Sequence, residues 1–158
     1  MSTGHAPSEM TFVVAVDGSD ASDRALDHAV TMTAAIDGTL TVVHAVDPDV
    51  YDTGGPDPAG DRSEAERRLI VEDVEDAEHR GEEVLEDAAE RAAESGVAVE
   101  TELLYGNPVE TIPSFATGEG YDGIFVGHRG LSEREERVLG SVAKGLVERA
   151  DVPVTVVR

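Results

Sequence analysis

A set of spaced glycines followed by a serine is the part of the sequence whose residue types could do chemistry. Residues 127–130 read Gly-His-Arg-Gly, and after nine further residues positions 140–142 read Gly-Ser-Val. Glycine lets ligand atoms approach the backbone closely and tolerates positive φ in a tight loop, where successive N–H groups can form an anion nest. The second group opens a predicted helix, whose unpaired N–H groups and positive dipole end favour a phosphate. In a purely structural interpretation, the glycines only turn the chain and Ser141 only caps the helix.

Several other binding-site patterns are absent from the sequence, which limits the kinds of cofactor and nucleotide site that we expect. No G-x-x-x-x-G-K-[ST] segment is present, which excludes a P-loop NTPase. No G-x-G-x-x-G directly follows the first predicted strand, which disfavours a dinucleotide-binding fold. The five histidines do not pair at a zinc-ligand spacing. A phosphate would therefore be neutralised by backbone N–H groups, by Arg129 and by a divalent cation, with Mg²⁺ or Mn²⁺ carried by the phosphates near Asp17. Arg129 could instead pair with Glu133 or Glu135.

The charge balance excludes several classes of partner. The chain has 158 residues, 34 of them acidic and 12 basic, which gives a formal net charge of −22. Because such a field repels phosphate backbones and anionic lipid headgroups, we expect no nucleic-acid and no membrane partner. No apolar run approaches the roughly 20 residues that a bilayer span requires, and the N-terminus lacks a secretory signal pattern.

Two further features of composition concern the cellular setting. The chain has no cysteine, which excludes cysteine catalysis and is compatible with a reducing cytoplasm, the compartment we expect. Lys144 is the single lysine among the 12 basic residues. This acidic, lysine-poor composition resembles that of cytoplasmic proteins from halophilic archaea, although an acidic mesophilic protein would share it.

Strand and helix patterns alternate along the chain. The sequence predicts strands at 11–17, 39–46, 97–105, 121–127 and 151–158, and helices at 21–36, 63–95, 108–117 and 141–149. This alternation implies an α/β fold with a parallel sheet covered by helices on both faces. In such sheets ligands bind beyond the carboxyl ends of the strands. We expect a flexible tail over residues 1–10, a single domain over 11–158 and a loop over 47–62.

Individual residues mark where the predicted helices begin, end or break. Ser19 or Asp20 is expected to cap the first helix, and Asn107, followed by a proline, is expected to cap the third. Gly38 is expected to end the first helix, and Gly81 is expected to mark a kink or a break in the long second helix.

Four segments resemble the ATP-binding branch of the universal stress protein family. They are VVAVDGSDASDRAL from residue 13, VVHAVD from residue 42, YDGIFVGHRG from residue 121 and LGSVAKGLVERADVPVTVVR from residue 139. The resemblance covers nearly the whole chain. It implies an open five-stranded parallel sheet of order 3-2-1-4-5 in a Rossmann-like fold of the adenine nucleotide alpha hydrolase type.

The resemblance also implies the residues of an ATP site. Asp17 with its two predecessors lies near the ribose and adenine, and the backbone of Ala45 reads the adenine edge. The expected nucleotide-binding residues are Ala15, Val16, Asp17, Ala45, Val126, Gly127, His128, Arg129, Gly130, Gly140, Ser141 and Val142. Ala143 departs from the family, whose members often carry Ser or Thr there, and this removes one hydroxyl donor worth about 1 kcal/mol. His44 is interpreted as structural.

Three functions follow as hypotheses. The first is an ATP-binding module for stress response or signalling, with weak ATP hydrolysis at most and unidentified protein partners. The second is an enzyme proper, a nucleotide hydrolase or adenylyl-transferring relative, and the third is a nucleotide-free dimeric scaffold or chaperone-like protein. The apolar segment 152–157 falls at a sheet edge in the implied order, which predicts a homodimer through this strand unless the N-terminal tail covers it.

Overall fold

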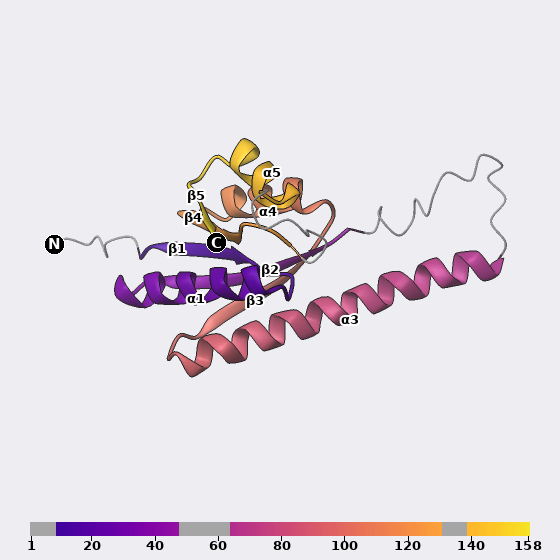
Figure 1. Ribbon diagram of the computed structural model, residues 1–158, viewed down its shortest axis with the longest axis horizontal. Helices are drawn as coiled ribbons and strands as arrows, with labels where there is room; N and C mark the ends of the chain where they lie inside the picture. The colour runs from indigo at the N-terminus through magenta and orange to yellow at the C-terminus, as the bar shows by residue number, and fades with distance from the viewer. Residues whose placement is uncertain (1–8, 48–63, 131–138) are drawn as a thin grey trace.

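A five-stranded parallel sheet organises the computed structural model, which describes residues 9–47, 64–130 and 139–158 (Figure 1). Its strands are β1 (Thr11–Ala15), β2 (Thr39–Val46), β3 (Val99–Tyr105), β4 (Gly123–Gly127) and β5 (Val154–Val157). The spatial order is β3-β2-β1-β4-β5, which confirms the predicted topology. Most of the expected tail and of the 47–62 loop lies outside the described residues, as do Glu133 and Glu135.

Helices cover both faces of the sheet, as predicted. On one side lie α1 (Asp20–Ala35) and α3 (Glu64–Glu94), and on the other lie α4 (Pro108–Gly118) and α5 (Ser141–Arg149) (Figure 1). Within the described residues, no helix is both long enough and apolar enough to cross a membrane.

The central strands β1 and β4 are mainly apolar because both faces of the sheet are buried there, whereas the edge strand β3 carries exposed Glu100 and Glu102. Val14 faces the α1–α3 layer and packs with Leu26 and Leu85, whereas its neighbour Val13 faces the other layer and packs with Leu146. Successive side chains of a strand point to opposite faces, so a strand covered on both faces shows a continuous apolar run rather than an alternating one. The two hydrophobic cores, one on each face of the sheet, hold the carboxyl ends of the strands in fixed positions.

The predicted caps are present, but one helix end differs from the prediction. Ser19 caps α1 by accepting a hydrogen bond from the Ser22 N–H (3.1 Å), and Asn107 Oδ1 caps α4 by accepting one from the Val109 N–H (3.0 Å). After α1 the residue with positive φ is Asp37 (φ 52°), not Gly38. A Cβ on Gly38 would lie 2.5 Å from the Met10 carbonyl oxygen, so glycine there permits close approach to the chain entering β1.

The structure has no break at Gly81, since α3 runs through that residue without interruption. Gly81 is buried against the sheet, and a Cβ on it would lie 2.8 Å from His44 Cδ2 and 2.9 Å from Leu103 Cδ1. The glycine therefore serves close packing of the helix on the side chains of β2 and β3.

Candidate functional site

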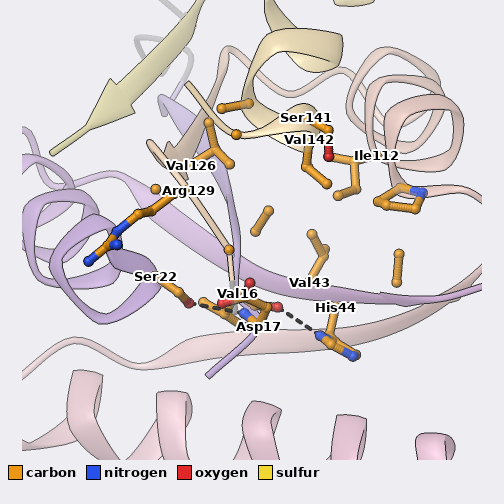
Figure 2. Close-up of a pocket in the computed structure, with 17 residues that line it drawn as sticks. Val16, Asp17, Ser22, Val43, His44, Ile112, Val126, Arg129, Ser141 and Val142 are labelled. Carbon is orange, nitrogen blue, oxygen red and sulfur yellow. Dashed lines mark hydrogen bonds between the residues drawn. The ribbon is translucent and has the colours of Figure 1, made fainter. Parts of the chain in front are cut away.

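A cavity of about 260 Å³ lies at the carboxyl edge of the sheet (Figure 2). The ends of β1, β2 and β4 and the first turns of α4 and α5 line it. The chain leaves β1 toward β2 on one side, while β4 pairs with β1 on the other. The cavity is therefore at the topological switch point, where open α/β sheets bind their ligands.

The structure brings eleven of the twelve predicted binding residues around this one cavity. They are Ala15, Val16, Asp17, Ala45, Val126, Gly127, Arg129, Gly130, Gly140, Ser141 and Val142. Although they come from four separate segments of the chain, the parallel topology places them together.

His128 is the predicted residue that does not line the cavity. Its side chain is 6% exposed, and its Nδ1 atom has no hydrogen-bond partner among the described residues. Its backbone N–H donates to the Val157 carbonyl (2.8 Å), and its carbonyl accepts from the Gly140 N–H (2.6 Å). In this structure the His128 backbone therefore joins β4 to β5 and to the start of α5, while its side chain is buried.

The glycines of the loop act through close approach, not through positive φ. Neither Gly127 nor Gly130 has a positive φ, so that part of the prediction is wrong. A Cβ on Gly127 would lie 2.8 Å from the Ala21 carbonyl carbon and oxygen, and a Cβ on Gly130 would lie 2.7 Å from Asp17 Oδ2. Gly127 lets α1 pack against β4, and Gly130 lets the loop pass beside the Asp17 carboxylate.

Asp17 is held in place from α1. Its Oδ1 accepts a hydrogen bond from the Ser19 N–H (2.9 Å), and its own N–H donates to the Ser22 hydroxyl oxygen (3.0 Å). Ser22 is only 3% exposed, so its position is determined by packing. These contacts turn the chain away from the sheet after Val16, and the strand therefore ends two residues before the predicted Asp17.

The N-terminus of α5 faces the cavity. Gly140 is the N-cap residue and makes no side-chain capping hydrogen bond, so the first-turn N–H groups at Ser141 and Val142 have no cap from that residue. The first N–H groups of a helix lack intrahelical acceptors and, together with the dipole, favour an anion. In Figure 2 the Arg129 side chain extends toward α1, away from Ser141.

Six residues line the cavity that were not predicted to bind the nucleotide. They are Ser22, Val43, His44, Pro108, Ile112 and Ala143. Two had signals in the sequence, because Val43 shares a strand face with Ala45, and Ala143 follows the predicted Val142. Ile112 lies one helical turn after Pro108, but only the packing of α4 shows that this turn borders the cavity.

The lining divides into an apolar part and a polar part. Val43, Ile112 and Val142 make an apolar surface, while Asp17 and Ser141 supply polar groups. Such a cavity suits a ligand with a flat apolar portion and an anionic group. Among the described residues, no cluster of three or more His, Asp or Glu side chains is placed to hold a metal ion.

Comparison with known proteins identifies the family. The model of the universal stress protein family matches residues 10–158. Universal stress protein YxiE of Bacillus subtilis is 35% identical over 146 residues, covering 92% of this chain and 97% of YxiE.

Two solved structures with bound nucleotides have the same fold. A universal stress protein in complex with cAMP has a TM-score of 0.67 at 28% identity, covering 94% of this chain and 97% of its own. The Archaeoglobus fulgidus universal stress protein in complex with dAMP has a TM-score of 0.65 at 25% identity, covering 94% and 98%. With the family model matching almost its entire length, the chain belongs to the universal stress protein family.

Proposed function

We propose that the cavity binds an adenine nucleotide, with ATP as the ligand, and that the protein acts as a nucleotide-dependent module in stress response or signalling. The observation that carries the proposal is the arrangement of the lining: an apolar slot and the N-terminus of α5 border the same cavity. Two family members of the same fold are described as complexes with cAMP and dAMP, which supports an adenine nucleotide as the class of ligand.

The base and the phosphates would occupy opposite parts of the cavity. Adenine would pack between Val43 and Ile112, with the backbone of Ala45 at its edge, and the ribose would lie beside Asp17. The phosphates would accept hydrogen bonds from the first turn of α5 and from the Ser141 hydroxyl. Since the described residues offer no metal-binding cluster, Mg²⁺ or Mn²⁺ would be carried by the phosphates and water, with Asp17 as the nearest predicted carboxylate.

The proposed assembly is a homodimer through residues 152–157. β5 is an edge strand whose segment Val154–Val157 contains no charged residue. Its outer row of backbone groups could pair with the same strand of a second copy, giving a closed two-fold dimer. We also propose that the protein is cytoplasmic and that its cell maintains a high internal salt concentration.

Mass spectrometry of the purified protein after denaturation tests the proposed ligand directly. We expect an adenine nucleotide to be released, and ATP to bind to nucleotide-stripped protein by calorimetry in molar KCl. Release of no nucleotide together with no heat of ATP binding would contradict the proposal and favour the nucleotide-free scaffold. Steady hydrolysis above about 1 s⁻¹ would instead favour the enzyme hypothesis.

A further inference from the structure

His44 makes a hydrogen bond that holds one wall of the cavity. Its Nδ1 atom lies 2.7 Å from the Val16 carbonyl oxygen. A carbonyl oxygen can only accept, so the proton of this bond belongs to Nδ1. The Val16 N–H donates in turn to the Val43 carbonyl (2.9 Å). Val16 is therefore bonded to β2 through both of its backbone groups, beyond the last residue of β1.

The same imidazole ring supports α3. Gly81, in the interior of the helix, lies so close to the ring that a Cβ would come within 2.8 Å of His44 Cδ2 and 3.4 Å of Nε2. Glycine inside a helix costs about 1 kcal/mol relative to alanine, and close packing on His44 and Leu103 accounts for its presence here. The ring thus lies between the helix on one side and the Val16 carbonyl on the other.

Val16 connects this contact to the polar end of the cavity. The next residue, Asp17, has its carboxylate against Gly130, where a Cβ would lie 2.7 Å from Oδ2. A displacement of the ring would shift the Val16 carbonyl, then Asp17, and then Gly130, which borders the same cavity. Figure 2 shows the bond from His44 to Val16 at the base of the cavity, next to Asp17.

We propose that His44 is a positioning residue that couples α3 to the nucleotide cavity. A protein partner that binds α3, or a substitution in α3, would then alter the affinity for the nucleotide. This inference rests on the proposed function, because the ligand it concerns is the adenine nucleotide. Although His44 also lines the cavity, its Nδ1 atom donates to a protein carbonyl, and in this proposal it acts on the ligand through Val16 and Asp17.

Substitutions of His44 distinguish the effect of its hydrogen bond on ligand affinity from the effect of its packing. The affinity is measured by calorimetry with AMP. His44→Leu leaves the Val16 carbonyl without its donor, and we expect AMP affinity to fall about tenfold. His44→Asn places an amide N–H near the position of Nδ1, and we expect affinity within about twofold of the wild type. Wild-type affinity in His44→Leu, or equal losses in both variants, would overturn the proposal.

A double-mutant cycle tests the connection to α3. Gly81→Ala pushes a methyl group against the ring, and we expect AMP affinity to fall about three- to tenfold, whereas Glu83→Ala on an exposed position of the same helix leaves it unchanged. In a His44→Ala background only the contact with Leu103 remains, so Gly81→Ala should lower AMP affinity much less than in the wild type. An equal effect in both backgrounds would overturn the coupling.

An NMR measurement distinguishes failure of this inference from failure of the proposed function. Nitrogen-15 spectra of the imidazole should show the Nδ1–H tautomer of His44 in the nucleotide-free protein, and Gly81→Ala should shift the Asp17 amide resonance. If the wild type binds neither AMP nor ATP, the proposed function fails, and a shifted Asp17 resonance would still support coupling of α3 to the cavity wall. An Nε2–H tautomer with an unshifted Asp17 resonance would overturn the coupling itself.

Discussion

The two helical layers of the sheet differ in charge and in how closely they pack. Helix α3 alone contains 13 acidic and four basic residues, whereas α4 and α5 together contain two of each. Helix α1 buries seven residues, whereas α4 buries three and α5 buries two. The α1–α3 layer is acidic and contains the helix with the most buried residues, and we call it the tight layer; the α4–α5 layer is close to neutral and borders the cavity.

This difference has a consequence for any phosphate-bearing ligand. An anion is repelled by a layer as acidic as α3, whereas the N-terminus of α5 offers backbone N–H groups on the neutral side. The tight layer also carries the contacts that fix Asp17, through Ser19 and Ser22 of the α1 cap. In our interpretation the α1–α3 layer positions the cavity wall and the α4–α5 layer receives the ligand.

Salt concentration should have the largest effect, because it acts on the whole acidic layer. The Debye length falls from about 10 Å at 0.1 M salt to about 3 Å at 1 M, so repulsion within α3 and between α3 and α1 is screened. We expect Tm, followed by circular dichroism, to rise steeply from low salt to molar KCl. A flat Tm over this range would contradict both the halophilic setting and the charge difference between the layers.

Gly127→Ala should destabilise the fold through the tight layer. The added Cβ would lie 2.8 Å from backbone atoms of Ala21, which cannot move without shifting α1. We expect a loss of about 2–3 kcal/mol in the free energy of unfolding in urea.

Gly145→Ala is the matched control in the other layer. Its Cβ would meet the side chain of Val109 rather than backbone, at 2.5 and 2.6 Å from the two Cγ atoms and 3.1 Å from Cβ. The gain of about 1 kcal/mol in helix propensity offsets part of this clash, so we expect a loss of about 1–2 kcal/mol, smaller than that of Gly127→Ala. A larger loss for Gly145→Ala than for Gly127→Ala would reverse the comparison.

Gly130→Val should weaken ATP binding at least about tenfold while the fold is kept, an effect of about 1.4 kcal/mol. The valine side chain would displace the Asp17 carboxylate and fill space beside the loop. Gly118→Val is the control, since a Cβ there meets no atom within 4 Å. Calorimetry with ATP on both variants checks the prediction, and equal ATP affinities would refute the proposed phosphate loop.

Val156→Pro should shift the protein from dimer to monomer. Ile124 N–H donates to the Pro153 carbonyl and His128 N–H to the Val157 carbonyl, so in a parallel ladder the odd-numbered residues of β5 bond to β4. The N–H of Val156 therefore points outward, and proline removes it. Light scattering in molar KCl measures the change, and a wild type that is monomeric at tens of micromolar would contradict the proposed interface.

Asp27→Asn should have the smallest effect. The Arg91 Nε and Nη2 groups donate to the two carboxylate oxygens of Asp27 at 2.7 and 2.8 Å, joining α1 to α3. Because both side chains are about half exposed, solvent screens the pair, and we expect a loss of about 0.5–1 kcal/mol at pH 7.

The effect of Asp27→Asn should also depend on pH. The hydrogen bond from Arg91 lowers the pKa of Asp27 below its ordinary value of 3.8. A lowered folded-state pKa gives stability that is present above pH 3.8 and is lost as the pH falls through the folded-state pKa. The difference in unfolding free energy between wild type and variant, measured in urea, should therefore close below pH 3.8. A constant difference would assign the effect to packing.

The elements were predictable because their signals are local. β2 occupies its predicted range 39–46, and Asn107 caps α4 as its place before a proline indicates. Eleven of the predicted binding residues line one cavity because strand ends and a helix start are readable from sequence and parallel topology brings them together. The family resemblance supplied the strand order that turned those separate segments into one site.

Only the tertiary structure decided which residues pack against which, because such contacts join segments that are remote in the sequence. Gly81 resembles a helix breaker until His44 is seen beneath it, and Gly127 resembles a turn residue until the backbone of α1 is seen beside it. In the sequence, His128 stands where a ligand-facing residue is expected. In the structure its side chain is buried and its backbone forms hydrogen bonds with Gly140 and Val157. Local patterns determine where helices and strands begin, and the fit between distant surfaces determines what each glycine and histidine does.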